Sequence, residues 1–283
     1  MKRIEGFIPV EGGKVWYEMN GEMGSTPLIV LHGGPGYPHD YLEPLRALDE
    51  DRQVLFYDQL GCGNSDESDA SLWTVEHFVT ELQDIVDFFS FEKYHLLGQS
   101  WGSALALSFA LKKPHGLRSL ILSDPYIGTP IWVEDAQRLI ASLPEDMSAA
   151  LETAKKGSEE YKRASREYYD RFVKRLLPYP EACVRSDTKM NGALYNYMWG
   201  DQEYKPNGTL SDFDLVPRLP EIAIPVLLLC GRYDEATPES AAKFQELLPN
   251  AQCEVFEDSA HFPFWNKTEE YNRAVQAFLR SQD

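Results

Sequence analysis

The sequence has 283 residues, 43% apolar and 25% charged, which is the composition of an ordinary globular protein with one large or two small domains. Its 27 basic and 45 acidic residues give a net charge of −18, which repels phosphate and makes nucleic acids and anionic membranes poor partners. The 14 Phe, 15 Tyr and 6 Trp need burial, which excludes a chain that is disordered throughout.

The amino-terminal segment lacks the apolar stretch of a signal peptide, and no apolar run approaches the roughly 18 residues that a membrane helix requires. The four cysteines have neither metal-ligand spacing nor the density of a disulfide scaffold. We therefore expect a cytoplasmic protein with reduced thiols, without a metal or other cofactor and without a membrane partner. The oligomeric state is left open.

The first part of the chain alternates predicted strands with predicted helices. In chain order these are two short strands around Gly12, strands that run into glycine-rich loops in 27–36 and 53–65, a helix at 74–89, a strand, turn and helix over 94–114, and a strand at 117–125. The strands are apolar through most of their length rather than alternating. This pattern predicts a mostly parallel sheet that is buried on both faces.

The same pattern returns late in the chain, with a strand in 225–238, a helix near 239–248, a strand at 252–258 and a closing helix near 267–280. Between these halves, residues 126–215 carry charge-rich helical segments and a cluster of aromatic residues. We expect an α/β fold in which residues 1–125 and 216–283 form one core and residues 126–215 form a helical cap inserted into it.

The sharpest local signal is the segment Gly98-Gln99-Ser100-Trp101-Gly102. A serine between a strand and a helix, with glycines two residues away on each side, is typical of a strained turn that exposes the serine Oγ. The glycines allow this turn to pack closely against its neighbours. The predicted strand before Ser100 and the predicted helix after it make Ser100 the candidate nucleophile.

A serine nucleophile needs a general base and an acid that orients the base, in the chain order serine, acid, histidine for this arrangement. Of six histidines, only His261 lies in a loop after a late strand, so it is the candidate base. Asp234, which follows the penultimate strand, is the candidate acid. Asp258 is the main rival and Asp124 a weaker one.

Acyl transfer also requires donors for the developing oxyanion. The glycine-rich segment His32-Gly33-Gly34-Pro35-Gly36 follows a strand that is expected to neighbour the nucleophile strand. We assign the backbone N–H groups of Gly34 and Trp101 as the oxyanion donors. A phosphate-binding loop is disfavoured because no Gly-Lys-Ser/Thr sequence follows.

The segments LHGGPG, DQLGCGNS, GQSWG, GRYDEATP and SAHFP together make the chain resemble the proline iminopeptidase family of α/β hydrolases and its amino-acid amidase relatives. The resemblance extends from about residue 5 to 280. It implies an α/β-hydrolase fold with a helical cap, and an enzyme that removes an N-terminal residue, often proline, from short peptides. The implied partner is a small peptide or aminoacyl substrate with a free amino terminus.

In this family, acidic residues near the cap and the catalytic acid hold the free amino group of the substrate. The resemblance assigns this role to Glu203 and Glu235, and it departs from the common family pattern at Asp201, where many relatives have proline. An ammonium group in a half-buried pocket needs carboxylate partners. The aromatic residues Tyr195, Tyr197, Trp199 and Trp101 could wall a pocket for a pyrrolidine ring, or pack the cap.

We therefore expect a serine hydrolase that releases an N-terminal residue, preferably proline, through an acyl-enzyme. The alternative is an esterase, lactonase or amidase that acts on small molecules, possibly in a biosynthetic pathway, which would use the same serine, acid and histidine without an amine-binding site. A non-catalytic binding protein on the same fold is disfavoured by the complete set of candidate catalytic residues. A dehalogenase is disfavoured because the sharp turn carries Ser100 rather than an aspartate.

Overall fold

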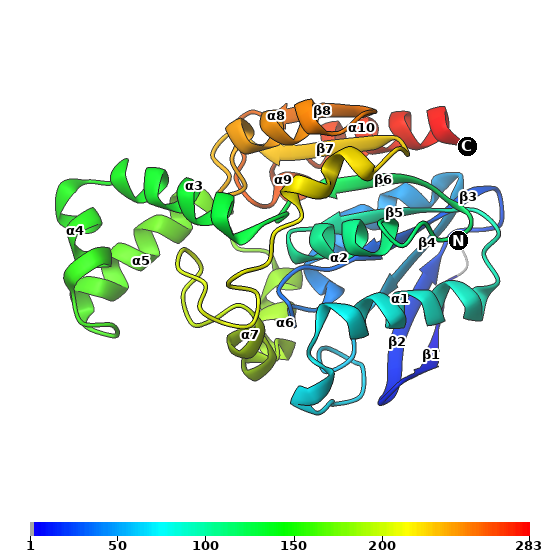
Figure 1. Ribbon diagram of the computed structural model, residues 1–283, viewed down its shortest axis with the longest axis horizontal. Coiled ribbons are helices and arrows are strands. Elements are labelled where there is room, and N and C mark those ends of the chain that lie inside the picture. The colour runs from blue at the N-terminus through cyan, green and yellow to red at the C-terminus, as the bar shows by residue number, and fades with distance from the viewer. Residues whose placement is uncertain (1–2) are drawn as a thin grey trace.

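Residues 3–283, which the computed structural model describes, form one mixed sheet (Figure 1). Its strands are β1 (Ile4–Val10), β2 (Gly13–Asn20), β3 (Ser25–Leu31), β4 (Arg52–Tyr57), β5 (Tyr94–Gln99), β6 (Leu117–Ser123), β7 (Val226–Gly231) and β8 (Ala251–Phe256). The spatial order is β1-β2-β4-β3-β5-β6-β7-β8. β1 and β2 form an antiparallel hairpin, β2 pairs antiparallel with β4, and all later neighbours are parallel. The predicted α/β fold with a mostly parallel sheet is confirmed.

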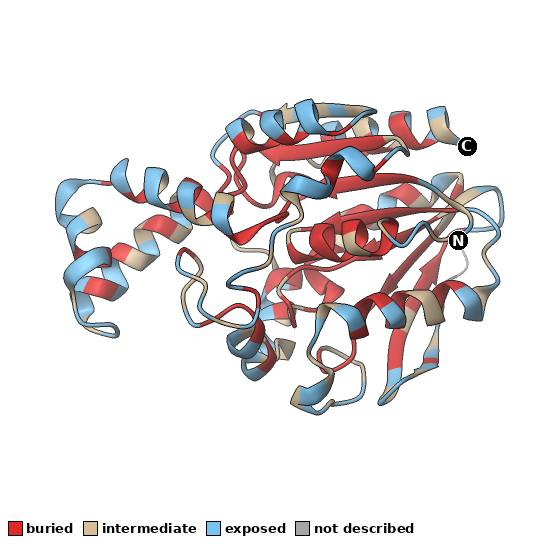
Figure 2. Cartoon of the chain, viewed as in Figure 1, coloured by how far each residue is buried: buried red, intermediate tan, exposed pale blue. Residues whose placement is uncertain are grey.

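Helices cover both faces of this sheet. They include α1 (Val75–Phe89), α2 (Trp101–Ala110), the 3-10 segments η1 (His39–Glu50), η2 (Ala70–Leu72) and η3 (Val216–Glu221), α8 (Pro238–Leu247), α9 (Pro263–Asn266) and α10 (Thr268–Gln282). Successive strand residues point to opposite faces. On β3, Ile29 packs in the cluster that includes α1, α2 and α8, whereas Leu28 packs with η1 and α10. Figure 2 shows the central strands buried and the outer helix faces exposed.

The helices between β6 and β7 form the inserted segment. They are α3 (Thr129–Ala141), α4 (Glu145–Thr153), α5 (Glu159–Phe172), α6 (Glu181–Lys189) and α7 (Gly192–Met198). In Figure 1, α3, α4 and α5 project beyond the end of the sheet. The predicted core begins at residue 1, and residues 1 and 2 lie outside the described part of the chain.

Backbone hydrogen bonds join the two ends of the insertion. Thr129 N–H donates to the Phe213 carbonyl at 2.8 Å, and Leu215 N–H donates to the Ile127 carbonyl at 3.0 Å. Gly128 and Asp214 form an isolated antiparallel bridge between these bonds. The insertion therefore leaves the core and returns to it at one place.

Local sequence accounts for several element boundaries. Thr74 begins α1 by accepting a hydrogen bond from the His77 N–H on its hydroxyl, at 3.1 Å, and Ser90 ends it in a left-handed conformation. The segment η1 is a 3-10 helix that carries Pro44, which removes a backbone donor. Among the described helices, none has both the length and the apolar character needed to cross a bilayer.

Candidate active site

The structure places Ser100 in the sharp turn between β5 and α2. Its φ of 54° and ψ of −118° lie in a region that residues with a side chain rarely adopt. A Cβ on Gly98 would lie 2.2 Å from the Gly102 carbonyl oxygen, and one on Gly102 would lie 2.2 Å from the Leu31 carbonyl oxygen. Both glycines are therefore required for this turn to pack against the sheet, and the turn directs Ser100 into a cavity.

His261 and Asp234 meet beside Ser100, although they come from loops after different strands. The Asp234 loop follows β7 and the His261 loop follows β8, and the His261 Nδ1 lies 2.7 Å from Asp234 Oδ1. Both side chains are buried. A proton on Nδ1 is held by the carboxylate, so Nε2 is left as the basic nitrogen. Within residues 3–283 no hydrogen bond joins Ser100 Oγ to His261, and such bonds often tighten only with substrate.

The two rival acids have different surroundings. The Asp258 side chain is 79% exposed, and its Oδ2 lies 3.8 Å from the Lys267 Nζ. Asp124 is fully buried. One of its carboxylate oxygens lies within 4.8 Å of a carboxylate oxygen of Asp234 and of a ring nitrogen of His261. Burial, and then the neighbouring Asp234 charge, raise the pKa of Asp124 well above its usual range. Asp124 is therefore the neutral member of a buried carboxyl pair.

A hydrogen-bonded chain holds the His261 backbone in place. Gln99 Nε2 donates to the His261 carbonyl at 3.2 Å, and the Tyr41 hydroxyl donates to Gln99 Oε1 at 2.5 Å. The same hydroxyl accepts the Gly33 N–H at 2.8 Å. Sequence reasoning misses Gln99 and Tyr41 in this role, because the only signal is that Gln99 precedes the candidate nucleophile.

The two backbone groups assigned as oxyanion donors lie beside the serine. Gly34 lines the same cavity as Ser100, and Trp101 is the first residue of α2. The Gly33 N–H is engaged by Tyr41, whereas no hydrogen bond within the described chain engages the N–H of Gly34 or Trp101. Gly34 has a φ of +112°, and a Cβ there would lie 2.6 Å from the Tyr37 backbone nitrogen, so only glycine fits.

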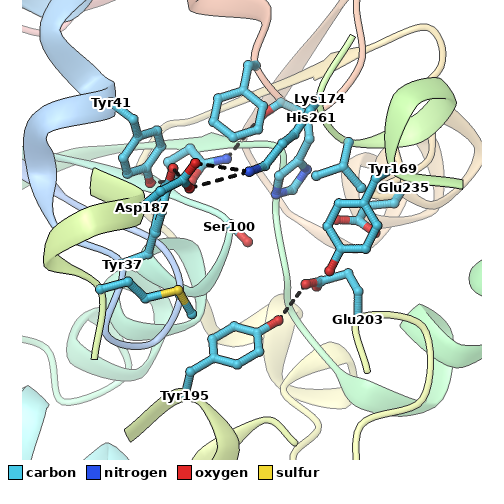
Figure 3. A pocket seen from close by; sticks show the side chains of 15 residues that line it. Tyr37, Tyr41, Ser100, Tyr169, Lys174, Asp187, Tyr195, Glu203, Glu235 and His261 are labelled. Carbon is cyan, nitrogen blue, oxygen red and sulfur yellow. Dashed lines mark hydrogen bonds and ion pairs between the residues drawn. The ribbon is translucent and has the colours of Figure 1, made fainter. Parts of the chain in front are cut away.

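Two carboxylates from distant parts of the chain face the cavity that Ser100 enters, which has a volume of about 220 Å³ (Figure 3). Glu203 accepts a hydrogen bond from the Tyr195 hydroxyl, and Glu235 accepts one from the Tyr168 hydroxyl at 3.4 Å. Asp201, which departs from the family pattern, lies at the surface and pairs with Lys156.

The environment of this pair disfavours two negative charges. Burial raises the pKa of Glu235 well above its usual range, and the charges of Glu203 and Asp234 add to this effect. Burial also raises the pKa of Glu203, while the hydrogen bond from Tyr195 opposes that shift. The pair therefore retains a proton at pH values at which exposed glutamates have lost theirs. A cation placed between the two carboxylates would replace that proton.

A small aromatic pocket opens beside Ser100 and Gly34. It is lined by Trp101, Tyr126, Trp132, Trp199 and the Glu203 side chain. The rings of Tyr126, Trp132 and Trp199 meet edge to face with centroid separations of 5.0–5.8 Å. This arrangement forms a rigid apolar box next to the candidate nucleophile.

The structure places the four aromatic residues that could wall the pocket in different surroundings. Trp101 and Trp199 line the aromatic pocket and Tyr195 lines the larger cavity, whereas Tyr197 is 44% exposed and packs edge-on against Trp73. The possibility that Tyr197 walls the substrate pocket is therefore wrong. Sequence reasoning also misses Tyr126 and Trp132, which come from the start of the insertion.

Three of the other four buried histidines have hydrogen-bond partners, whereas His77, in α1, has an Nε2 without one among the described residues. His32 Nε2 accepts the Gln59 N–H at 2.9 Å, and burial lowers the pKa of His32 to about 4, so this ring is neutral. His39 Nδ1 lies 2.7 Å from Asp58 Oδ1, and His95 is hydrogen-bonded to Ser119. Among the described residues that line the cavity with Ser100, His261 is the only histidine.

Comparison with known proteins identifies the family of the chain. Residues 26–268 match the model of the alpha/beta hydrolase fold family. The chain is 42% identical to a proline iminopeptidase of Heyndrickxia coagulans, over 98% of this chain and 99% of the relative. It is 35% identical to a proline iminopeptidase of Clostridium botulinum, over the full length of both.

Solved structures lead to the same family. A proline iminopeptidase of Mycobacterium smegmatis superimposes with a TM-score of 0.93 at 34% identity, over 99% of this chain and 98% of that one. The structure of VinJ also superimposes with a TM-score of 0.93 at 34% identity, over 99% of both chains. With full-length relatives above 30% identity and the fold family matched over most of its length, the chain belongs to the proline iminopeptidase family of α/β hydrolases.

Proposed function

We propose that Ser100, His261 and Asp234 form the catalytic triad of an enzyme that releases an N-terminal residue, preferably proline, from short peptides or aminoacyl amides. Membership of this family makes the protein a serine hydrolase that acts as an aminopeptidase. The observation that carries the specificity is the pair Glu203, which is half-buried, and Glu235, which is buried, both of which line the cavity that contains Ser100.

The first half of the reaction forms an acyl-enzyme. Ser100 Oγ attacks the carbonyl carbon of the first residue while His261 Nε2 takes the hydroxyl proton. Asp234 stabilises the imidazolium through the 2.7 Å contact with Nδ1. His261 then donates the proton to the leaving nitrogen, the C–N bond breaks, and the shortened peptide leaves.

The second half reverses these roles with water. His261 takes a proton from water, whose oxygen attacks the acyl carbon, and then returns a proton to Ser100 Oγ as the C–O bond breaks. In both halves the oxyanion accepts hydrogen bonds from the N–H groups of Gly34 and Trp101. The free amino acid is the second product.

The substrate ammonium lies between Glu203 and Glu235 in this proposal. Hydrogen bonds from Tyr195 and Tyr168 hold the two carboxylates in place. The position of the carboxylates therefore sets how far the substrate amino group lies from the carbonyl that Ser100 attacks. That distance admits one residue ahead of the bond. A blocked amine would leave a buried carboxylate without its cation, which is costly.

The aromatic pocket is assigned to the side chain of that first residue. Its walls are aromatic rings in edge-to-face contact, and its free volume of about 10 Å³ must widen to admit a pyrrolidine ring. Because Tyr126, Trp132 and Trp199 lie at the two ends of the insertion, side-chain preference comes from residues 126–215. The joined ends of this segment support its proposed role as a cap over the core formed by residues 1–125 and 216–283. The cytoplasmic location stays a prediction that rests on the sequence.

Four substrates test the proposal together: a prolyl anilide, the alanyl anilide, the N-acetylated prolyl anilide and a short-chain ester. We expect rapid cleavage of the free prolyl anilide, slower cleavage of the alanyl compound and no measurable cleavage of the acetylated one. Cleavage of the ester alone would retain the triad and reject the amine-binding role of the two glutamates. It would favour an esterase instead.

A further inference from the structure

We propose that Lys174 binds the C-terminal carboxylate of the substrate, on the leaving-group side of Ser100, so that the preferred substrates are very short peptides with both termini free. This inference rests on the proposed function. It adds a second charged subsite to the one formed by Glu203 and Glu235.

The position of Lys174 places its side chain in the catalytic cavity. The residue follows the end of α5, where its backbone N–H donates to the Tyr169 carbonyl at 2.7 Å. Its side chain lines the same cavity as Ser100 and His261 but does not line the aromatic pocket. With the first residue of the substrate in the aromatic pocket, the rest of the cavity is left for the leaving group.

Figure 3 shows the two sides of this cavity. Asp187 and Tyr37 lie on one side of Ser100, and Glu203 lies on the other, next to Glu235. The Lys174 ammonium is directed to the Asp187 side, to which it is joined by ion-pair contacts. The cavity therefore has an acidic subsite for an ammonium at one end and a lysine at the other, with the nucleophile between them.

The charge distribution gives this lysine a particular role. Among the described residues that line the cavity, Lys174 is the only lysine or arginine, while Asp187, Glu203 and Glu235 are acidic. The whole chain has a net charge of −18. A peptide carboxylate that enters this cavity meets mostly repulsion and needs a local cation to be held there.

The Lys174 ammonium can accept a new partner without leaving its present one unsatisfied. Its distances to Asp187 Oδ1 and Oδ2 are 3.3 and 3.5 Å, longer than the roughly 2.7–2.9 Å of strong charge-assisted bonds. An ammonium has three donors. Asp187 Oδ1 also accepts the Tyr37 hydroxyl at 2.9 Å, so it keeps a donor if the lysine turns to a substrate.

A dipeptide carries its carboxylate close to the scissile bond. Two extended residues span about 7 Å, so the carboxylate of a dipeptide lies one residue beyond the scissile bond. Lys174 also lines a second cavity, next to Arg175 and Leu177.

The test compares prolyl-glycine with prolyl-glycinamide, which differ only in the carboxylate. The readout is the ratio of kcat/KM for the acid to kcat/KM for the amide, measured with the full-length protein. We expect Lys174→Met to lower this ratio about tenfold, as for the loss of one charge-assisted contact. Lys174→Arg should preserve most of it, and Asp187→Asn should raise it by removing the competing carboxylate.

Arg175→Met is the matched control, since it removes one positive charge at the next residue, where the guanidinium packs over the Tyr233 ring at 4.2 Å. We expect it to preserve the ratio. An equal loss in Arg175→Met and Lys174→Met would indicate a long-range charge effect and overturn the inference. An unchanged ratio in Lys174→Met would also overturn the inference, even if kcat/KM fell equally for the acid and the amide. Lys174 would then serve only to hold α5 against α6.

The prolyl anilide separates this failure from failure of the proposed function. It has no carboxylate, so its hydrolysis tests only the triad and the amine-binding glutamates. If the anilide is cleaved and the acid-to-amide ratio does not depend on Lys174, the aminopeptidase proposal stands and the carboxylate subsite is rejected. If the anilide is not cleaved, the proposed function itself is wrong.

Discussion

The sheet edge and the inserted segment contribute different parts of the candidate site. Ser100, Asp234 and His261 follow the ends of three parallel strands, and the strained turn at Ser100 is held by close backbone packing. Glu203, Trp132 and Trp199 come from the insertion between β6 and β7. The difference indicates that the core supplies the reaction and the insertion supplies most of the recognition, with Glu235 as the exception because it adjoins Asp234.

The largest effect should come from the core. Ser100→Ala removes the nucleophile, and we expect kcat on the prolyl anilide and on a short ester to fall about 10⁴-fold or more. The free energy of unfolding should change little, because alanine removes only the hydroxyl. Turnover on both substrates, together with thermal unfolding, checks this. Substantial residual turnover of either substrate in a folded variant would refute the triad.

Substitutions in the amine-binding pair should affect one substrate class only. Glu203→Gln and Glu235→Gln each remove a carboxylate partner of the ammonium, and we expect kcat/KM on the prolyl anilide to fall about 100-fold. The ester has no ammonium and should lose far less. Glu239→Gln, at an exposed acid in the first turn of α8, is the matched control. Equal losses on anilide and ester would remove the amine-binding role.

The pH dependence of KM should separate recognition from reaction. The pKa values of Glu203 and Glu235 are raised, so the pair gains negative charge as pH rises. KM for the prolyl anilide should therefore decrease with rising pH, by about tenfold per unit while the acid that must ionise is still protonated. KM for the ester should stay flat. A KM profile that is parallel for both substrates would contradict this.

The smallest effect concerns Asp124, the neutral partner of Asp234. A carboxyl whose pKa is higher in the folded state than in the unfolded state reduces stability as pH rises between the two values. Asparagine mimics the protonated acid and can still accept the Ser123 hydroxyl, which lies at 2.6 Å. We expect Asp124→Asn to keep kcat within about tenfold and to raise the free energy of unfolding at pH 8 by about 1 kcal/mol or more.

The control for this prediction is the same measurement at pH 4, where the gain should shrink, because Asp124 is then protonated to a larger extent in the unfolded chain as well. Asp124→Ala would leave Asp234 without a neutral neighbour and should lower kcat more than Asp124→Asn does. A gain that is the same at both pH values would show that the Asp124 proton is not involved.

Local sequence is sufficient for the sheet and for the sharp turn at Ser100, the candidate nucleophile. Ser100 could be predicted because its turn depends on glycines two residues away, and His261 because its place after a late strand is visible in the strand pattern. The choice between Asp234 and Asp124 was harder. The two carboxyls come together only through the pairing of β6 with β7, which composition does not reveal.

The insertion was the least predictable part. Its helical character could be predicted from charge spacing, but the partners of each side chain depend on long-range packing. Tyr197 points outward to Trp73, whereas Trp199, two residues later, faces Ser100. Lys174 carried no sequence signal, because its role depends on the cavity formed between the end of α5 and α6.

The paired ends of the insertion have a consequence for how enzymes of this family diversify. Because the chain leaves and rejoins the core through one bridge between Gly128 and Asp214, the spacing of β6 and β7 does not depend on what lies between. The helices α3 and α4, which project beyond the sheet, can change there more freely than α6, whose Ser186 Oγ accepts the N–H of Tyr41, a residue in the hydrogen-bonded chain to His261. Changes in the insertion can thus alter which peptide is accepted while the residues proposed to break the bond stay the same.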